Sequence, residues 1–197
     1  VRALFPQQRD YLEVYEHAGL ATTKSTFAHG IYLSKDELQR LFLAGSKIAF
    51  CPSSNLFLGS GLFDLPRLQF ANVKVGIGTD VGAGTSLSML QTIADAYKTQ
   101  RLAGNDLSPL SGLYMATLGG TQSLDCDADI GNFKIGKEAD FTVLDPESTP
   151  LMSYRMQNCK SLEERLAVIV LLGDDRAISA PYASGLCVHD RGIGKEC

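Results

Sequence analysis

The sequence predicts an α/β protein built around a parallel sheet. Short apolar runs occur at residues 26–30, 47–51 and 73–79, and each is followed by a stretch with helical spacing. Strands that are apolar along their whole length are buried on both faces, which is typical of parallel sheets with helical crossovers. His29 lies at the end of the first run and Asp80 directly follows the third. Polar, ionisable side chains are unusual at the ends of buried strands that have only a structural role.

Helices are expected before, between and after these strands. Ser34 begins the second of them, with Glu37 three residues later as in a capping box, and Gly45 ends it. Ser86 is expected to cap the last one. The strand at 47–51 stops at Pro52, which cannot continue a sheet ladder. The expected helices cover residues 8–18, 35–44, 63–70 and 86–103.

The second half of the chain changes character and predicts a small β-rich unit. A helix over 107–118 is expected to stop at the glycine pair 119–120, and a turn-rich stretch then leads into a strand at 141–146. A capped helix over 161–172 precedes an edge strand within 177–188, where Pro181 is tolerated. We therefore divide the chain into a βα part, residues 1–120, and a β-rich flank, residues 121–197.

Composition excludes several functional classes. The net charge of −4, with both signs interspersed, is unlike a nucleic-acid-binding surface. Apolar runs are shorter than the roughly 20 residues that span a bilayer, and the first residues lack the pattern of a signal peptide. The cysteines are odd in number and without a CxxC pair, which favours reduced thiols in a cytoplasmic protein; they are Cys51, Cys126, Cys159, Cys187 and Cys197.

The number of strands points to a larger fold. Three βα units are too few to close a barrel, which needs about eight strands. A three-stranded parallel sheet alone would leave two apolar edges unpaired. Because the chain also lacks an initiator Met, we expect it to begin within a longer protein whose earlier strands are not in this sequence.

His29 and Asp80 together suggest half of a metal site. The carboxyl ends of parallel strands are where barrel active sites form, and an unpaired buried carboxylate is costly. The plainer alternatives are a core histidine with satisfied ring nitrogens and an aspartate that caps the next helix. Cys51 is interpreted as a buried, unreactive thiol. Ser53, Ser54, Asn55 and Ser60 are consistent with either substrate contacts or ordinary turn chemistry.

Several segments, in order, resemble the amidohydrolase superfamily of metal-dependent (β/α)8 barrels. They are Ala28-His29-Gly30, the stretch from Ala49 to Asn55, Gly78-Thr79-Asp80, and the stretch from Ile130 to Asp140. Within that superfamily the chain is most similar to the guanine deaminase family. The residues that carry this likeness are 53–63, 79–90, 116–120 and 172–176. The resemblance runs from about Leu4 to about Ile178.

The resemblance implies the last three βα units of the barrel plus its flank, and a zinc-dependent hydrolysis of guanine to xanthine and ammonia. His29 and Asp80 match metal ligands at the ends of the sixth and eighth strands, with one Zn²⁺ per complete active site. Asp80 also matches the residue that takes a proton from the attacking water. A neutral His29 would need an acceptor for its other ring nitrogen. The family's remaining histidine ligands and its glutamate proton shuttle lie on earlier strands, and His17 and His189 do not match them.

Two alternatives stay open. One is another heterocycle or s-triazine aminohydrolase, although the residues after Asp80 favour guanine. The other is a catalytically silent fragment or interaction module, because two protein ligands alone hold zinc weakly. We expect the isolated chain to be inactive and the complete enzyme to be a homodimer acting on a small purine. No substrate-binding residue is assigned.

Overall fold

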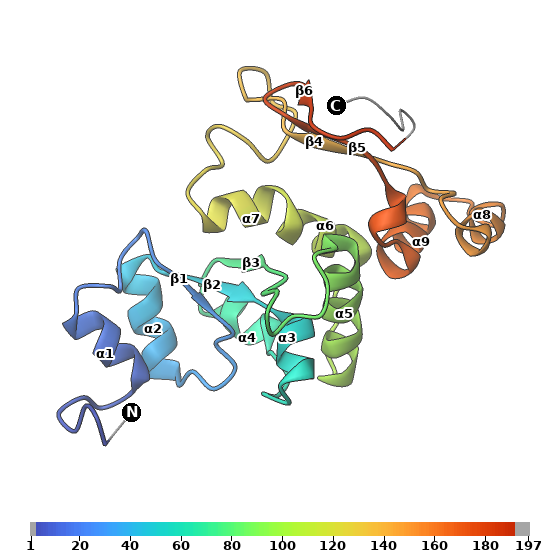
Figure 1. Cartoon of the computed structure of the whole chain (residues 1–197). Coiled ribbons are helices and arrows are strands. Elements are labelled where there is room, and N and C mark those ends of the chain that lie inside the picture. Colours follow the sequence, from blue (N-terminus) through green and yellow to red (C-terminus); the bar gives the residue numbers. More distant parts are fainter. Residues whose placement is uncertain (1–2, 192–197) are drawn as a thin grey trace.

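A computed structural model describes residues 3–191 of the chain. Its first half contains a parallel sheet of strands β1 (Thr26–Ala28), β2 (Lys47–Phe50) and β3 (Val75–Ile77), with β2 in the centre (Figure 1). Ile48 pairs with Phe27 on one side and with Val75 on the other. The three apolar runs therefore form parallel strands, as predicted.

Helices connect these strands. The capping box at the start of the second helix is present, because Ser34 Oγ accepts from the Glu37 amide at 3.1 Å and Glu37 Oε2 accepts from the Ser34 amide at 2.7 Å. Gly45 ends this helix with a left-handed φ of 68°. The helices of the first half are α1 (Tyr11–His17), α2 (Lys35–Ala44), α3 (Pro52–Phe57), α4 (Leu65–Phe70) and α5 (Met89–Leu102).

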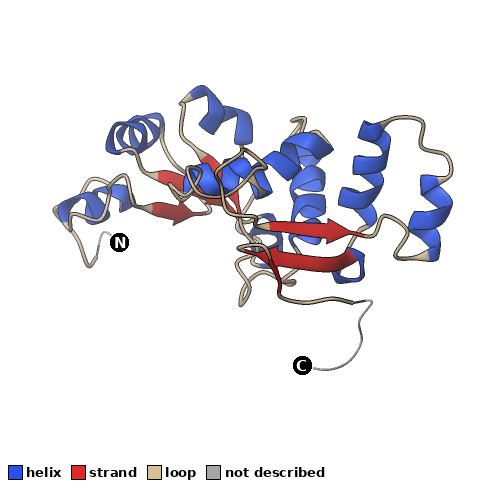
Figure 2. Cartoon of the chain, turned by 90° about the horizontal axis from the view of Figure 1, so that it is seen from above, coloured by secondary structure: helices blue, strands red, loops and turns tan. Residues whose placement is uncertain are grey.

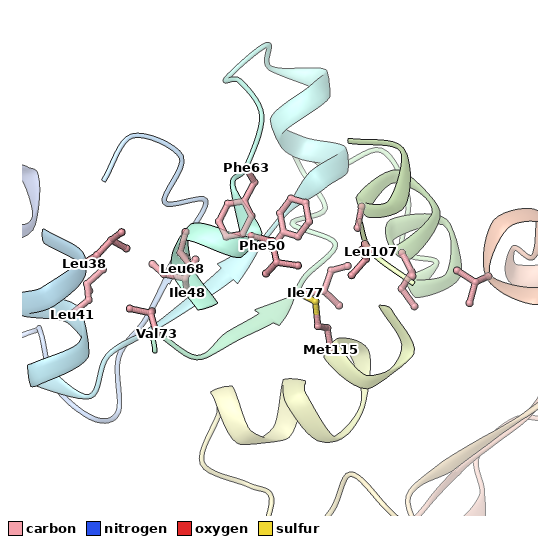
Figure 3. Close-up of a cluster of buried hydrophobic side chains, with 14 of the residues drawn as sticks. Leu38, Leu41, Ile48, Phe50, Phe63, Leu68, Val73, Ile77, Leu107 and Met115 are labelled. Carbon is pink, nitrogen blue, oxygen red and sulfur yellow. The ribbon is translucent and has the colours of Figure 1, made fainter. Parts of the chain in front are cut away.

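One hydrophobic core joins the parallel sheet to its helices (Figure 3). At its centre the rings of Phe50 and Phe63 stack with centroids 4.4 Å apart and an interplanar angle of 12°. Ile48, Ile77 and Met115 extend the core toward the helices on either side. Burial of this kind of side chain stabilises the fold by about 1.5–3 kcal/mol for each residue. The core thereby holds the ends of β1, β2 and β3 in a defined arrangement.

The region after α5 corrects one sequence prediction. Helix α6 (Pro109–Ala116) ends at Thr117, and a new helix, α7 (Leu118–Ser123), contains Gly119 and Gly120 instead of stopping before them. A Cβ on Gly119 would lie 2.8 Å from the Tyr114 ring, and one on Gly120 would lie 3.0 Å from the Met115 carbonyl oxygen. The glycines thus permit a close approach of α7 to the last turn of α6. Helix α7 lies across the parallel strands and contacts β3 (Figures 1 and 2).

A second, antiparallel sheet follows, in the order β4 (Phe141–Leu144), β5 (Ile178–Ala183) and β6 (Leu186–Cys187). Residues 177–188 were expected to form an edge strand, and this is wrong: β5 is the central strand and β6 pairs beside it. Pro181 is accommodated because its carbonyl accepts from the Val188 amide at 3.0 Å, which needs no N–H from the proline. Between β4 and β5 lie α8 (Pro150–Met156), α9 (Leu162–Leu172) and the 3₁₀ turn η1 (Asp175–Ala177).

The start of α5 also differs from the expectation. Ser88, and not Ser86, is the N-cap, and its Oγ accepts from the Gln91 amide at 3.4 Å. Ser86 instead accepts from the Ser88 amide at 3.0 Å and shapes the turn before the helix. Within residues 3–191 no helix is both long and apolar enough to cross a membrane. The four cysteines in that range are free thiols, and Cys197 lies outside the described residues.

Candidate metal centre

The structure places His29 and Asp80 at the same edge of the parallel sheet. The His29 amide donates to the Ala49 carbonyl at 2.9 Å, and the Gly78 amide donates to the Phe50 carbonyl at 2.9 Å. The hydrogen-bond pairing of β1 with β2 and of β3 with β2 therefore continues one residue past β1 and past β3. This brings the segments that carry His29 and Asp80 to the same end of β2. His29 and Asp80 themselves have left-handed backbones, with φ of 71° and 51°. Strain of this kind in residues other than glycine is concentrated at functional sites.

The two side chains face each other across a short gap. His29 Nε2 and Asp80 Oδ2 lie 3.6 Å apart, and both side chains are just over one-third exposed. Two ligands bound about 2.1 Å from one tetrahedral Zn²⁺ lie about 3.4 Å from each other. The observed separation therefore fits two side chains that flank one zinc ion.

Asn55 contacts the opposite nitrogen of the same imidazole. It lies in α3, directly after β2, and its Oδ1 is 2.7 Å from His29 Nδ1. The Asn55 side chain is buried, and its Nδ2 atom has no hydrogen-bond partner among the described residues; the same is true of Ser54 Oγ. The sequence indicated an acceptor for His29 without naming it. Only the fold shows that Asn55, from a different βα unit, lies at that ring nitrogen.

Cys51 completes a group of three potential metal-ligating residues. Its sulfur lies within 4.8 Å of the donor atoms of His29 and Asp80, and this is the one such group within the described part of the chain. Burial, together with the nearby Asp80 carboxylate, raises the pKa of the Cys51 thiol to about 11. The thiol is therefore protonated at neutral pH, which supports its interpretation as an unreactive buried residue.

The glycine-rich turn after Asp80 is folded tightly onto the strand end. The Asp80 carbonyl accepts from the Ala83 amide at 3.2 Å and the Gly84 amide at 2.5 Å. A Cβ on Gly84 would lie 1.8 Å from the Thr79 carbonyl oxygen, so only glycine fits this approach. Because α5 begins later and is capped by Ser88, Asp80 is not a helix cap. The turn instead sets the position of the Asp80 carboxylate.

The remaining candidate residues have structural contacts. Ser53 Oγ donates to Asp95 Oδ2 on α5 at 2.8 Å, and the Ser60 carbonyl accepts from the Tyr32 hydroxyl at 2.7 Å. Asp174 and Arg176, among the residues that carry the family likeness, form a salt bridge after α9, in which Arg176 donates to both carboxylate oxygens. His17 lies in the last turn of α1, and His189 is exposed after β6.

The fold and this site define a class of protein. The chain belongs to the amidohydrolase family, whose family model, "Amidohydrolase family", matches residues 1–188. It is similar to guanine deaminase of Escherichia coli, with 49% identity over 191 residues that cover 97% of this chain and 44% of that protein. The chain thus spans less than half the length of this curated relative, a share consistent with a C-terminal portion. The expected resemblance to guanine deaminases is confirmed.

Solved structures agree with the sequence comparison. The solved structure of E. coli guanine deaminase superimposes with a TM-score of 0.95, covering 97% of this chain and 45% of that one at 49% identity. A guanine deaminase from C. acetobutylicum with guanine bound in the active site gives a TM-score of 0.83 at 29% identity, covering 96% and 45%. An adenosine deaminase from Xanthomonas campestris with bound zinc gives 0.78 at 25% identity, covering 95% and 42%.

Proposed function

We propose that this chain is the C-terminal part of a zinc-dependent guanine deaminase, which hydrolyses guanine to xanthine and ammonia. The observation that carries the proposal is the approach of His29 and Asp80 at one strand edge, in a chain that is 49% identical to a guanine deaminase. The guanine-bound structure of a relative supports the same substrate.

The architecture fits a part of a larger barrel. We propose that β1, β2 and β3 are the last three strands of an eight-stranded barrel and that the barrel part ends near residue 120. In the described residues β1 and β3 each have a strand on one side only. Further strands in a complete polypeptide would pair with those edges and remove the exposed ladder groups. The antiparallel sheet of β4, β5 and β6 would belong to the flank.

His29 and Asp80 would hold the metal through Nε2 and a carboxylate oxygen. When bound, Zn²⁺ supplies the Lewis acidity that makes water a competent nucleophile at neutral pH. Asp80 would accept the proton that this water loses, because its carboxylate is partly exposed and lies beside His29 Nε2. His29 would keep its Nε2 edge toward Asp80, since its Nδ1 is engaged by Asn55.

The described residues supply only part of a zinc site. Catalytic zinc is bound by at least three protein ligands in most enzymes, and the third nearby donor here is a protonated thiol. We therefore propose that activity requires earlier strands of a complete polypeptide, and that the isolated chain is inactive. We further propose that the complete enzyme is a homodimer, which size-exclusion chromatography with light scattering would test.

Ammonia release by the complete polypeptide tests the function. We expect turnover of guanine, stoichiometric zinc by elemental analysis, and loss of both in His29→Ala and Asp80→Asn. His189→Ala and Asp106→Asn, at exposed positions, serve as matched controls and should retain zinc and activity. Deamination of cytosine or an s-triazine with no turnover of guanine would instead identify a different aminohydrolase. Tight, stoichiometric zinc binding and guanine turnover by the 197 residues alone would contradict the partial-enzyme proposal.

A further inference from the structure

We infer that Asn55 is a positioning residue that holds the His29 imidazole in a single tautomer, with the proton on Nδ1 and a free electron pair on Nε2. The inference rests on the proposed function only in its consequence for metal binding. The tautomer itself is a property of this chain and can be measured without metal or substrate.

The contacts at the two ring nitrogens support this tautomer. Asn55 Oδ1 is a carbonyl oxygen and only accepts hydrogen bonds, so at 2.7 Å the proton belongs to His29 Nδ1. On the other side, Nε2 lies 3.6 Å from Asp80 Oδ2, which is too long for a hydrogen bond. An Nε2–H facing a carboxylate would be expected to shorten that contact to about 2.7–2.9 Å. In a neutral imidazole a proton on Nδ1 leaves Nε2 unprotonated, so the Asn55 contact carries the inference.

Asn55 is itself held rigidly. The backbone N–H of Asn55 donates to the Cys51 carbonyl at 3.0 Å, and its backbone carbonyl accepts from the Ser60 N–H at 2.9 Å. The whole residue is only 2% exposed. Pro52 starts the short helix that carries it, and Ser53 ties the same turn to α5. A fixed acceptor at this position orients the imidazole ring as well as selecting its tautomer, as outer-shell partners of metal-binding histidines do.

The opposite amide orientation makes a different prediction. Rotation of the Asn55 amide by half a turn would place Nδ2 against Nδ1, giving this buried nitrogen the partner that it lacks. Nδ1 would then be an acceptor, and the proton would move to Nε2, where it would block a cation. The two arrangements differ in which ring nitrogen is protonated, so a single spectroscopic measurement separates them.

The experiment is ¹⁵N–¹H NMR of the 197-residue chain at about pH 8, where an ordinary histidine is neutral. The chain has only three histidines, and His29→Gln assigns the relevant signals. We expect protonated Nδ1 and unprotonated Nε2 in the wild-type chain and in Asn55→Asp, which keeps an acceptor. Asn55→Ala should give a mixture of tautomers. Asn105→Ala, which removes the hydrogen bond that Asn105 Nδ2 donates to Gln100 Oε1 elsewhere in the chain, should leave the His29 signals unchanged.

Zinc affinity in the complete polypeptide is the second readout. Loss of an outer-shell partner typically weakens metal binding about 10–100-fold, so we expect that loss in Asn55→Ala and partial recovery in Asn55→Asp. A protonated Nε2 in the wild-type chain, or the same tautomer and affinity in Asn55→Ala, would overturn the inference. If guanine is not turned over but the tautomer and affinity changes are found, the proposed function fails while the role of Asn55 stands.

Discussion

Lys47 and Asp125 form an ion pair that joins the parallel sheet to the segment after α7. Lys47 Nζ lies 2.6 Å from Asp125 Oδ2, and its side chain is only 4% exposed. The same ammonium group donates to the Thr23 carbonyl. A buried ammonium requires such partners, because an unpaired charge in the interior is costly. The start of β2, at the sheet end opposite to His29, is thus connected to the C-terminal half.

Replacing Asp125 and replacing Lys47 should lower the stability of the protein by unequal amounts. Asp125→Asn leaves the buried ammonium without its carboxylate and should lower the free energy of unfolding clearly. Lys47→Met removes the buried charge and keeps an apolar side chain of similar length, so its effect should be smaller. Urea unfolding followed by circular dichroism measures both. Equal destabilisation by the two variants would contradict a buried, charge-dependent contact.

The same pair should make stability depend on acid pH. The hydrogen bond from Lys47 lowers the pKa of Asp125 below its usual value of 3.8. A group whose pKa is lowered by folding stabilises the protein above its unfolded pKa, and the effect is lost as the pH falls through the folded value. Between pH 5 and pH 3, the wild-type chain should therefore lose more stability than Asp125→Asn. An equal loss in the free energy of unfolding for both proteins between pH 5 and pH 3 would contradict this prediction.

The stacked pair Phe50 and Phe63 should dominate the stability of the first half. Each phenyl ring is almost completely buried, and Phe→Ala at such positions costs about 3–5 kcal/mol. A double-mutant cycle should give a coupling of about 0.5–1.5 kcal/mol between the rings. Phe70→Ala, at a position 92% exposed, is the control and should change stability by no more than about 0.5 kcal/mol. Coupling near zero would show that the rings do not interact in solution.

The Gly84 turn should control the position of Asp80. Gly84→Ala would place a Cβ 1.8 Å from the Thr79 carbonyl oxygen, so the turn must shift. A displacement of about 1 Å at a catalytic group can cost about 10²-fold in rate, and we expect a loss of that order in kcat/KM for guanine in the complete polypeptide. Gly78→Ala is the matched control, because its Cβ would lie 3.7 Å from Cys51 Sγ, an ordinary contact. Similar activity in both variants would contradict the role of the turn.

Cys51 should resist alkylation in the folded protein. Its thiol is buried and its pKa is raised to about 11, so little thiolate is present at pH 8. Cys187 is exposed and provides an internal comparison. Iodoacetamide followed by peptide mapping should label Cys187 in the native state and label Cys51 only after denaturation. Native labelling of Cys51 at the rate of Cys187 would show that the strand end opens readily.

Much of the fold was predictable because its signals are local. Apolar runs identify β1, β2 and β3, and the Ser34 capping box is visible as a spacing of polar residues. The glycine pair in α7 and the central position of β5 were not predictable, because each depends on which segment packs alongside. A glycine that ends a helix and one that allows a close approach have the same local signature.

The sequence by itself determined the three parallel strands, the positions of His29 and Asp80 at the ends of two of them, and the family to which the chain belongs. Only the tertiary structure decided that these side chains lie 3.6 Å apart and that Asn55 contacts the far nitrogen of His29. The physical reason is that strand pairing determines which strand ends lie next to each other. Hydrogen-bond distances at that meeting point depend on backbone conformation and packing, which no single segment encodes.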